Sequence, residues 1–295
     1  MKKNNTYNDQ QTDRWSDFEK VKEHLEIPYI KTKVEVWAEM ESKLVALPPA
    51  RKTNLFERSS FRLAIAAMLV LMLGIAGLMR FYTVKIETLP GKHQLVNLPD
   101  GSSVLMNAGS ALKYHKYMWR FSRSISFRGE GFFEVVKGSP FTVISDHGKT
   151  RVLGTSFTIY SRDDSYRVAC LTGKVLVADA DNLHEVVLEQ NQKAELEQNG
   201  EFDIERNINP TSTTTWIQNK FVFTSAPFAE VLNEVERQFD VTITWPQGMD
   251  INYKYTGNFS REQNIEQVLD FVCRPFGIKY IKIKTNVFQL SKIGN

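Results

Sequence analysis

One uninterrupted apolar stretch, residues 63–79, constrains this 295-residue chain more than any other feature. Its 17 residues include no charged residue, no proline, no asparagine and no glutamine. As an α-helix that rises about 1.5 Å per residue it is about 26 Å long, and Phe61, Phe81 and Tyr82 extend it beyond about 30 Å. The stretch therefore predicts a helix, residues 61–82, that crosses the hydrocarbon layer of a membrane once.

Two other interpretations fit this stretch less well. A long buried helix of a soluble protein usually has a polar face, which residues 63–79 lack. A signal peptide lies within about the first 30 residues of a chain and ends at small residues, but this stretch begins later and ends at Leu78-Met79-Arg80.

Five basic residues lie between positions 43 and 62 and three between 80 and 92, which favours a cytoplasmic N-terminus and a periplasmic C-terminal part.

Residues 1–60 contain two short segments whose apolar residues recur at helical spacing. Pro28 separates the segments, and Pro48-Pro49 ends the second. Two short helices enclose little apolar surface, so their apolar faces predict a docking site for another protein. The alternative is that the helices pack on each other or lie on the membrane. The two faces consist of Trp15, Phe18, Val21 and Leu25, and of Val34, Trp37, Met40 and Leu44.

Composition and motifs argue against several classes of function. The formal net charge of +3 gives no reason to expect nucleic-acid binding. The five histidines are scattered, so no ligand spacing indicates a metal site, and no phosphate-binding loop or nucleophile elbow is present. We therefore predict no catalytic residues and no cofactor. Cys170 and Cys273 fall in different predicted domains, and we expect both to be buried free thiols.

Residues 84–208 predict an all-β domain, which the sequence leaves open as a sandwich, a roll or a solenoid. Its apolar and β-branched residues come in short runs bounded by turn-forming residues. We expect turns at Pro99-Asp100-Gly101 and at Gly129-Glu130-Gly131. The expected strands are residues 94–98, 103–106, 124–127, 132–136, 141–144, 156–160, 166–171, 174–178 and 185–189.

Residues 216–295 predict a small α+β domain after a polar linker at 211–215. Apolar residues at helical spacing predict helices at 227–238 and 264–276. Strands are expected at 221–223, 241–245, 253–259, 279–283 and 287–290. The resulting β-α-β-β-α-β-β order is typical of helices packed on a sheet, which leaves a free edge for a partner strand.

Five motifs follow one another in the all-β region: Leu98-Pro99-Asp100-Gly101-Ser102, Gly129-Glu130-Gly131-Phe132-Phe133-Glu134-Val135, Pro140-Phe141-Thr142-Val143, Val152-Leu153-Gly154-Thr155-Ser156-Phe157 and Thr172-Gly173-Lys174-Val175. In sequence and in order, these motifs resemble the FecR-like periplasmic domain. A second resemblance, centred on Tyr255-Thr256-Gly257-Asn258-Phe259, is to the C-terminal domain that accompanies it in Bacteroidetes proteins, itself similar to the short N-terminal domain of secretins and TonB-dependent transducers. Turn and core roles explain most of these residues, so the motifs indicate a fold rather than a catalytic site.

The resemblance implies a single-pass anti-sigma factor of the inner membrane. Its N-terminal helices would hold an extracytoplasmic-function sigma factor. Its periplasmic part would bind the signalling domain of a TonB-dependent outer-membrane receptor for iron chelates or glycans. Proteolysis near the membrane helix would relay the signal, because a lone helix has little to brace a mechanical push.

Two further hypotheses accompany this reading. If the turn were strained, the Thr155 hydroxyl would attack the Gly154 carbonyl and displace the Thr155 nitrogen, giving an ester that water then cleaves, as the resemblance to self-cleaving relatives implies. A plain turn entering a strand is the alternative that we favour. The rival class of function is a membrane-tethered periplasmic polysaccharide-binding protein, with Tyr114, Tyr117 and Trp119 as an aromatic platform.

Overall fold

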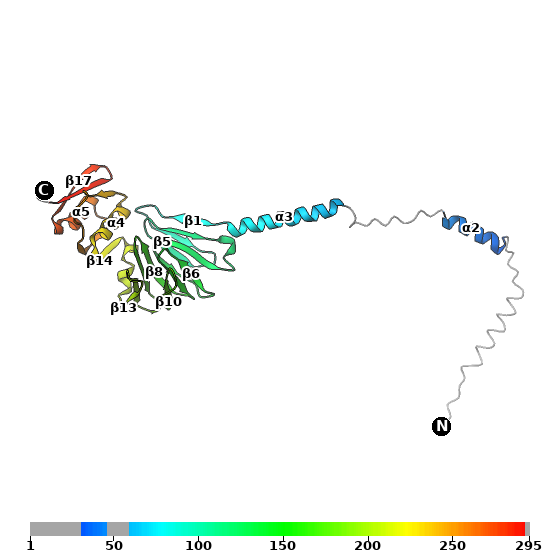
Figure 1. The fold of residues 1–295 in the computed structure, drawn as a ribbon, viewed down its shortest axis with the longest axis horizontal. Coiled ribbons are helices and arrows are strands. Elements are labelled where there is room, and N and C mark those ends of the chain that lie inside the picture. Colours follow the sequence, from blue (N-terminus) through cyan, green and yellow to red (C-terminus); the bar gives the residue numbers. More distant parts are fainter. Residues whose placement is uncertain (1–30, 46–58, 293–295) are drawn as a thin grey trace, which may run out of the picture. The chain divides into compact units, whose positions relative to one another are not determined.

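The computed structural model describes residues 31–45 and 59–292. Two helices come first in the described chain: α2, Lys33–Val45, and α3, Ser59–Phe81 (Figure 1). Within the described residues, α3 is the one helix long and apolar enough to cross a membrane, with a mean hydropathy of 2.3 in the most apolar 18-residue window of Phe61–Phe81. None of its most apolar window is buried against the rest of the protein, so its apolar side chains are free to contact lipid. The helix falls where the apolar stretch predicted one.

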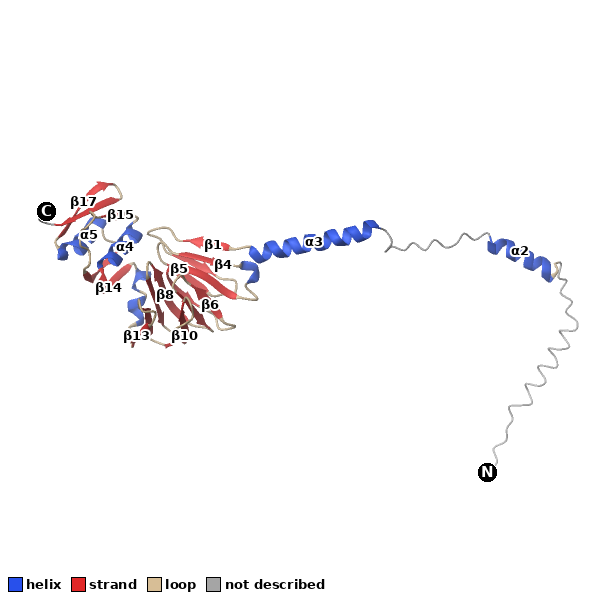
Figure 2. Cartoon of the chain, viewed as in Figure 1, coloured by secondary structure: helices blue, strands red, loops and turns tan. Residues whose placement is uncertain are grey.

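A β domain follows α3, and Figure 2 shows its strands in red. Apart from β5 and β6, which run parallel, neighbouring strands are antiparallel. The strands are β1 Val84–Glu87, β2 Gln94–Asn97, β3 Ser103–Met106, β4 Ala111–Tyr114, β5 Arg123–Glu134, β6 Phe141–Ile144, β7 Gly148–Val152, β8 Ser156–Arg162, β9 Ser165–Cys170, β10 Lys174–Asp179, β11 Glu185–Glu189, β12 Gln192–Leu196 and β13 Phe202–Arg206.

The long strand β5 belongs to two sheets. Its first half lies in a sheet of order β1-β4-β5-β6-β7-β10-β11, and its second half lies in a sheet of order β2-β3-β5-β8-β9-β12-β13. One hydrophobic core takes side chains from both sheets, including Phe127 and Phe133 on either side of the exchange. The domain is therefore a two-layered β structure whose layers are joined through a single strand.

The expected turn at Gly129-Glu130-Gly131 is wrong. These residues continue β5 at the point where its partners change from β4 and β6 to β3 and β8. Gly129 has φ +116°, and a Cβ there would lie 2.3 Å from the Ser110 Oγ, so the glycine allows two chain segments to approach closely without reversing the strand. The other expected turn, at Pro99-Asp100-Gly101, is confirmed between β2 and β3.

Five strands, β1, β4, β7, β12 and β13, were not expected from the sequence. β12 and β13 carry Lys193, Glu195, Asp203 and Glu205, which have low β propensity and resemble loop residues. They pair because β9 already presents an edge to β12, so the neighbouring strand rather than the local sequence decides their conformation.

Up to Lys292, where the described residues end, the C-terminal part contains two α-helices and five strands. β14 pairs with β16, while β15, β18 and β17 form a separate three-stranded sheet, so two small sheets replace the one that the sequence predicted. Val231, Leu232 and Val235 of α4 are completely buried in a second hydrophobic core. The elements are β14 Lys220–Pro227, α4 Phe228–Phe239, β15 Thr242–Thr244, β16 Lys254–Ser260, α5 Ile265–Cys273, β17 Ile278–Lys284 and β18 Val287–Lys292.

Both cysteines are buried free thiols, as predicted. Burial raises the pKa of Cys170 to about 11. Burial, with a smaller contribution from Asp270, raises the pKa of Cys273 to about 12. Neither thiol therefore carries an appreciable thiolate population at neutral pH, and both behave as small apolar core residues.

Candidate functional site

Helix α2 has one apolar and one charged face. On the charged face, Glu39 accepts a hydrogen bond from Lys43 at 3.3 Å and another from Lys31, which precedes the helix, at 2.7 Å. The first turn is capped, because Thr32 and Glu35 bond to each other's backbone N–H groups. On the other face, the four apolar side chains named from the sequence are exposed: Val34 by 77 %, Trp37 by 66 %, Met40 by 48 % and Leu44 by 60 %.

This face is therefore the part of the predicted docking surface that the structure describes. Exposed Trp and Leu side chains at this spacing are characteristic of helices that bind in a partner's groove. The other predicted residues, Trp15, Phe18, Val21 and Leu25, lie outside the described residues.

The Leu98–Ser102 motif forms a turn that is anchored to β5. Arg123 forms an ion pair with Asp100, and its Nε also donates to Asp100 Oδ2 at 2.7 Å. Ser102 Oγ donates to Asp100 Oδ2 at 2.9 Å and accepts from the Val136 N–H at 3.1 Å. Although burial alone would raise the pKa of Asp100, the bonds from Arg123 and Ser102 hold it below its usual value. The motif thus ties the β2–β3 turn to β5 and to the chain that follows it.

Glu130, from the second motif, begins a chain of hydrogen bonds that reaches helix α4. Asn107 Nδ2 donates to Glu130 Oε2 at 2.7 Å. Gln238 Nε2 donates both to Asn107 Oδ1 at 2.9 Å and to Glu234 Oε1 at 2.7 Å. Asn107, Gln238 and Glu234 are all buried. The chain is therefore a polar connection inside the contact between the β domain and the C-terminal part.

An ion pair runs beside this connection. Arg167 of β9 lies 2.5 Å from Glu230 of α4, and its guanidinium group stands 4.0 Å above the ring of Tyr160. Leu105 and Phe132 of the β domain pack against the C-terminal core. Apolar packing, a salt bridge and a hydrogen-bonded chain together hold α4 against the β domain.

The pKa values of the Glu130 and Glu234 carboxyl groups shift in opposite directions, although the two groups share one environment. Burial and the nearby Glu234 raise the pKa of Glu130 to about 7, although Arg162 opposes the rise. Burial would also raise the pKa of Glu234, but the charges of Arg162 and Arg237 outweigh it and lower that pKa. The pair therefore keeps one proton, held by Glu130, into the neutral range.

Because the folded protein holds this proton, we expect the protein to become less stable as the pH rises and the proton is lost. Glu130 titrates at about 7 when folded, against a reference value of 4.5, so the folded state binds more protons between these values. The free energy of unfolding should fall over that interval by on the order of a few kcal/mol. Glu130→Gln should remove this decrease while keeping an oxygen acceptor for Asn107. Urea unfolding of the full chain in detergent at pH 5 and pH 8 measures this decrease in the wild type and in Glu130→Gln.

The control variant is Glu134→Gln, which changes an exposed carboxylate on the same strand. It should keep the wild-type dependence on pH. The same dependence in wild type and Glu130→Gln would contradict the assignment of the proton to Glu130.

Two family models match the chain. Residues 84–176 match the model of the FecR protein, and residues 220–289 match that of FecR, C-terminal. The two matched ranges together comprise more than half of the 295 residues. The chain belongs to the FecR family. No curated protein matches it at a significant level.

Two solved structures resemble this FecR-family chain. Both are crystal structures of a putative anti-sigma factor from Parabacteroides distasonis ATCC 8503, at 2.50 and 1.65 Å resolution. Each has 27 % sequence identity to this chain and covers 72 % of it and 100 % of its own length. The TM-scores are 0.66 and 0.65, so this chain shares its fold with the two structures over the matched part.

In this FecR chain, the hydrogen-bonded chain joins the two matched ranges. Glu130 lies in the first range, and Glu234 and Gln238 lie in the second. Sequence reasoning missed the α4 residues, together with Arg162 and Arg167. The one available signal was the spacing of Glu230, Glu234 and Gln238, four residues apart on α4, but such a polar stripe is more typical of a solvent-facing side.

Gly154 and Thr155 form a tight connection before β8. Gly154 has φ +154°, and Thr155 is buried with its Oγ1 donating to the Lys174 carbonyl at 3.1 Å. The Thr155 backbone N–H and C=O both pair with Val135. This geometry fits the favoured alternative, a turn that enters a strand. Cleavage between the two residues stays a prediction.

The proposed aromatic platform is wrong. Tyr114 and Trp119 are buried in the core of the β domain, where their rings meet edge to face at 5.4 Å. Only Tyr117 of the three is exposed, and it contacts Tyr82. The side chains of Tyr114 and Trp119 belong to the apolar core, because β5 and β6 enclose them. They therefore offer no flat surface for a sugar.

Proposed function

We propose that this FecR-family chain is an anti-sigma factor that crosses the inner membrane once. Residues 1–60 would lie in the cytoplasm and residues 84–295 in the periplasm. Family membership and the likeness to the two anti-sigma factor structures support the regulatory role. The length and apolar surface of α3 support the single crossing, and the excess of basic residues before it supports the orientation.

The exposed apolar face of α2 is the observation that carries the proposal. A helix with a capped first turn, a paired charged face and an unburied Trp37 is suited to a groove on a partner. We propose that this partner is an extracytoplasmic-function sigma factor, which α2 would hold away from RNA polymerase.

The periplasmic part would receive the signal. We propose that it binds the signalling domain of a TonB-dependent outer-membrane receptor whose ligand is an iron chelate or a glycan. A lone membrane helix has no second helix against which to shift. We therefore propose that proteolysis near α3, rather than a push along it, releases the sigma factor.

Trp37→Asp tests the sigma-factor contact. Burying an aspartate in an apolar groove is unfavourable, and losing a tryptophan anchor costs about 2–4 kcal/mol of binding free energy. We expect the affinity of the full chain in detergent for the sigma factor to fall by about 30-fold or more. Surface plasmon resonance with the immobilised sigma factor measures the change.

The matched control is Ser42→Asp, which adds the same charge on the other side of the exposed helix. It should bind within about threefold of the wild type, because its side chain lies off the apolar face. Equal binding by the wild type and Trp37→Asp would refute the role of this face.

A further inference from the structure

The chain that leaves α3 contacts the loop between β4 and β5. The ring centroids of Tyr82 and Tyr117 lie 5.4 Å apart. Next to them, Thr83 Oγ1 and His115 Nδ1 share a hydrogen bond of 3.2 Å. Tyr82 is the first residue after α3, so these contacts hold the loop, residues 115–122, at the end of the membrane helix.

This loop holds two aromatic rings outward, because its centre is anchored inside the protein. Trp119 is buried in the core of the β domain. The Phe121 and Ser122 N–H groups both donate to the Met118 carbonyl, at 2.9 and 3.0 Å, which closes a turn around the tryptophan. Tyr117 and Phe121 lie two positions before and after Trp119, and they are 48 % and 80 % exposed. The loop therefore presents two rings that the described protein leaves uncovered.

Basic side chains accompany these rings. Arg80 lies at the end of α3, Lys116 and Arg120 lie in the loop, and all three are exposed. Neither residues 80–83 nor the loop include an aspartate or a glutamate. Aromatic rings concentrate at the level of the lipid headgroups, and lysine and arginine are attracted to anionic headgroups. The combination is therefore the one expected of a surface that touches a membrane.

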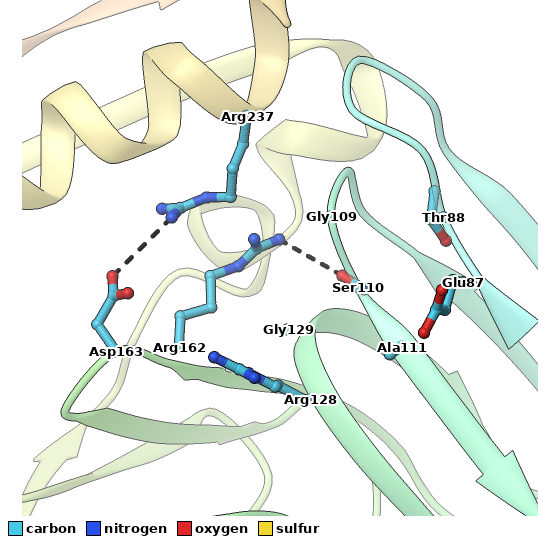
Figure 3. Close-up of a pocket in the computed structure, with 10 residues that line it drawn as sticks. All are labelled: Glu87, Thr88, Gly109, Ser110, Ala111, Arg128, Gly129, Arg162, Asp163 and Arg237. Atoms are coloured by element: carbon cyan, nitrogen blue, oxygen red, sulfur yellow. Dashed lines mark hydrogen bonds and ion pairs between the residues drawn. The ribbon is translucent and has the colours of Figure 1, made fainter. Parts of the chain in front are cut away.

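The opposite end of β1 lies at the contact with the C-terminal part. β1 begins at Val84, close to α3, and ends at Glu87. Glu87 lines a cavity with Asp163 of the β domain and Arg237 of α4, whose side chains lie 3.9 Å apart (Figure 3). The C-terminal part thus contacts the β domain away from α3, which leaves the loop at the other end of β1 free to face a membrane.

We propose that the loop between β4 and β5 is a membrane-binding surface whose partner is a bilayer with anionic headgroups. This inference rests on the single crossing of α3 proposed above. Tyr82 lies at headgroup level where α3 leaves the hydrocarbon layer, and its contact brings Tyr117 to the same level. Phe121 inserts beside them, and Lys116 and Arg120 pair with headgroup phosphates. The bound loop holds the β domain at the bilayer surface.

Quenching by lipid-attached nitroxides tests this contact in the full chain reconstituted into vesicles of phosphatidylcholine and phosphatidylglycerol. Ser122→Cys adds a thiol at an exposed position of the loop, and a maleimide fluorophore labels it selectively because both native thiols are buried. A nitroxide at headgroup level should quench this label. The same label at Thr285→Cys, in the exposed turn between β17 and β18, should stay unquenched.

Substitutions in the loop identify the groups that bind. Lys116→Gln combined with Arg120→Gln should shift the equilibrium from the bound to the free loop by about 30-fold, since each basic side chain near an anionic surface contributes about fivefold. High salt should act in the same direction. Phe121→Ser should also reduce the quenching, whereas Phe271→Ser, which removes an exposed phenylalanine of α5, should not. Quenching that is undiminished when all three loop substitutions are combined would overturn the proposal.

A label inside α3 separates failure of this surface from failure of the crossing. Gly74 lies within α3, and nothing lies within 4 Å of its Cβ position, so Gly74→Cys carries a label without crowding. A nitroxide deep in the acyl chains should quench it. Quenching at position 74 but not at 122 would overturn the loop contact and leave the crossing intact. No quenching at either position would overturn both.

Discussion

Replacing Arg123 by methionine is expected to lower the free energy of unfolding by about 3–5 kcal/mol. Arg123 and Asp100 are only 10 % and 15 % exposed, so the change leaves a carboxylate buried without its counter-charge. The carbonyls of Val136 and Ser139 also lose the guanidinium donors that now satisfy them. Urea unfolding of the full chain in detergent at pH 7 measures the loss.

An exposed ion pair provides the control for Arg123→Met. Lys174 and Glu189 lie 2.7 Å apart but are 69 % and 61 % exposed, so Lys174→Met should cost less than about 1 kcal/mol. Equal losses in the two variants would show that burial of the Asp100 pair contributes nothing.

The dependence on pH gives a second check. In the wild type the pKa of Asp100 is lowered, so its stabilising contribution is present above about 4 and is lost as the pH falls through the folded value. In Arg123→Met the Asp100 carboxyl can be relieved by protonation. The difference in stability between wild type and variant should therefore shrink below about pH 4. A difference that stays constant with pH would contradict the electrostatic explanation.

The second large effect is expected for Gly154→Ala. At φ +154° an added Cβ would lie 2.6 Å from the Cα of Lys137 and 3.0 Å from its N, and backbone atoms cannot rotate away as a side-chain end can. The segments are also fixed by the pairing of Thr155 with Val135. Backbone strain and overpacking together predict a loss of about 2–5 kcal/mol.

Gly248→Ala separates the two causes. Gly248 also has a positive φ, +84°, but nothing lies within 4 Å of its Cβ position, so only the strain should remain, about 1 kcal/mol. Equal destabilisation by Gly154→Ala and Gly248→Ala would contradict the close approach of Lys137.

The same purified proteins bear on the Gly154-Thr155 bond. Intact mass spectrometry of the wild type should give one unbroken chain, and two fragments that meet at this bond would show that the Thr155 hydroxyl does attack.

Local signals explain which parts of the fold were predictable. The membrane helix follows from composition alone, because no polar side chain interrupts it. Strands β3, β6 and β11 appear at the expected residues, since their apolar runs are bounded by turn residues. The turn at Asp100-Gly101 is a property of that dipeptide. At Gly129-Glu130-Gly131 the same reasoning failed, because glycine serves a close approach as well as a turn.

The candidate sites divide in the same way. The apolar face of α2 could be read from spacing, because helical periodicity alone places Val34, Trp37, Met40 and Leu44 together. The contact that joins Glu130, Asn107, Gln238 and Glu234 could not, since these residues are up to 131 positions apart and each is unremarkable by itself. The aromatic platform failed for the related reason that burial of Tyr114 and Trp119 depends on neighbouring strands.

The amino-acid sequence by itself determined that an apolar helix divides this chain, that a β-rich part follows, and that a smaller α+β part ends it. Those properties depend on hydrophobicity and on periods of a few residues, which neighbouring positions encode. Only the tertiary structure decided that β5 serves two sheets, that a carboxyl of β5 and the polar stripe of α4 meet, and that Arg162 lies buried where its charge acts on both Glu130 and Glu234. Those properties depend on which distant segments exclude water from one another, and that is settled when the chain packs.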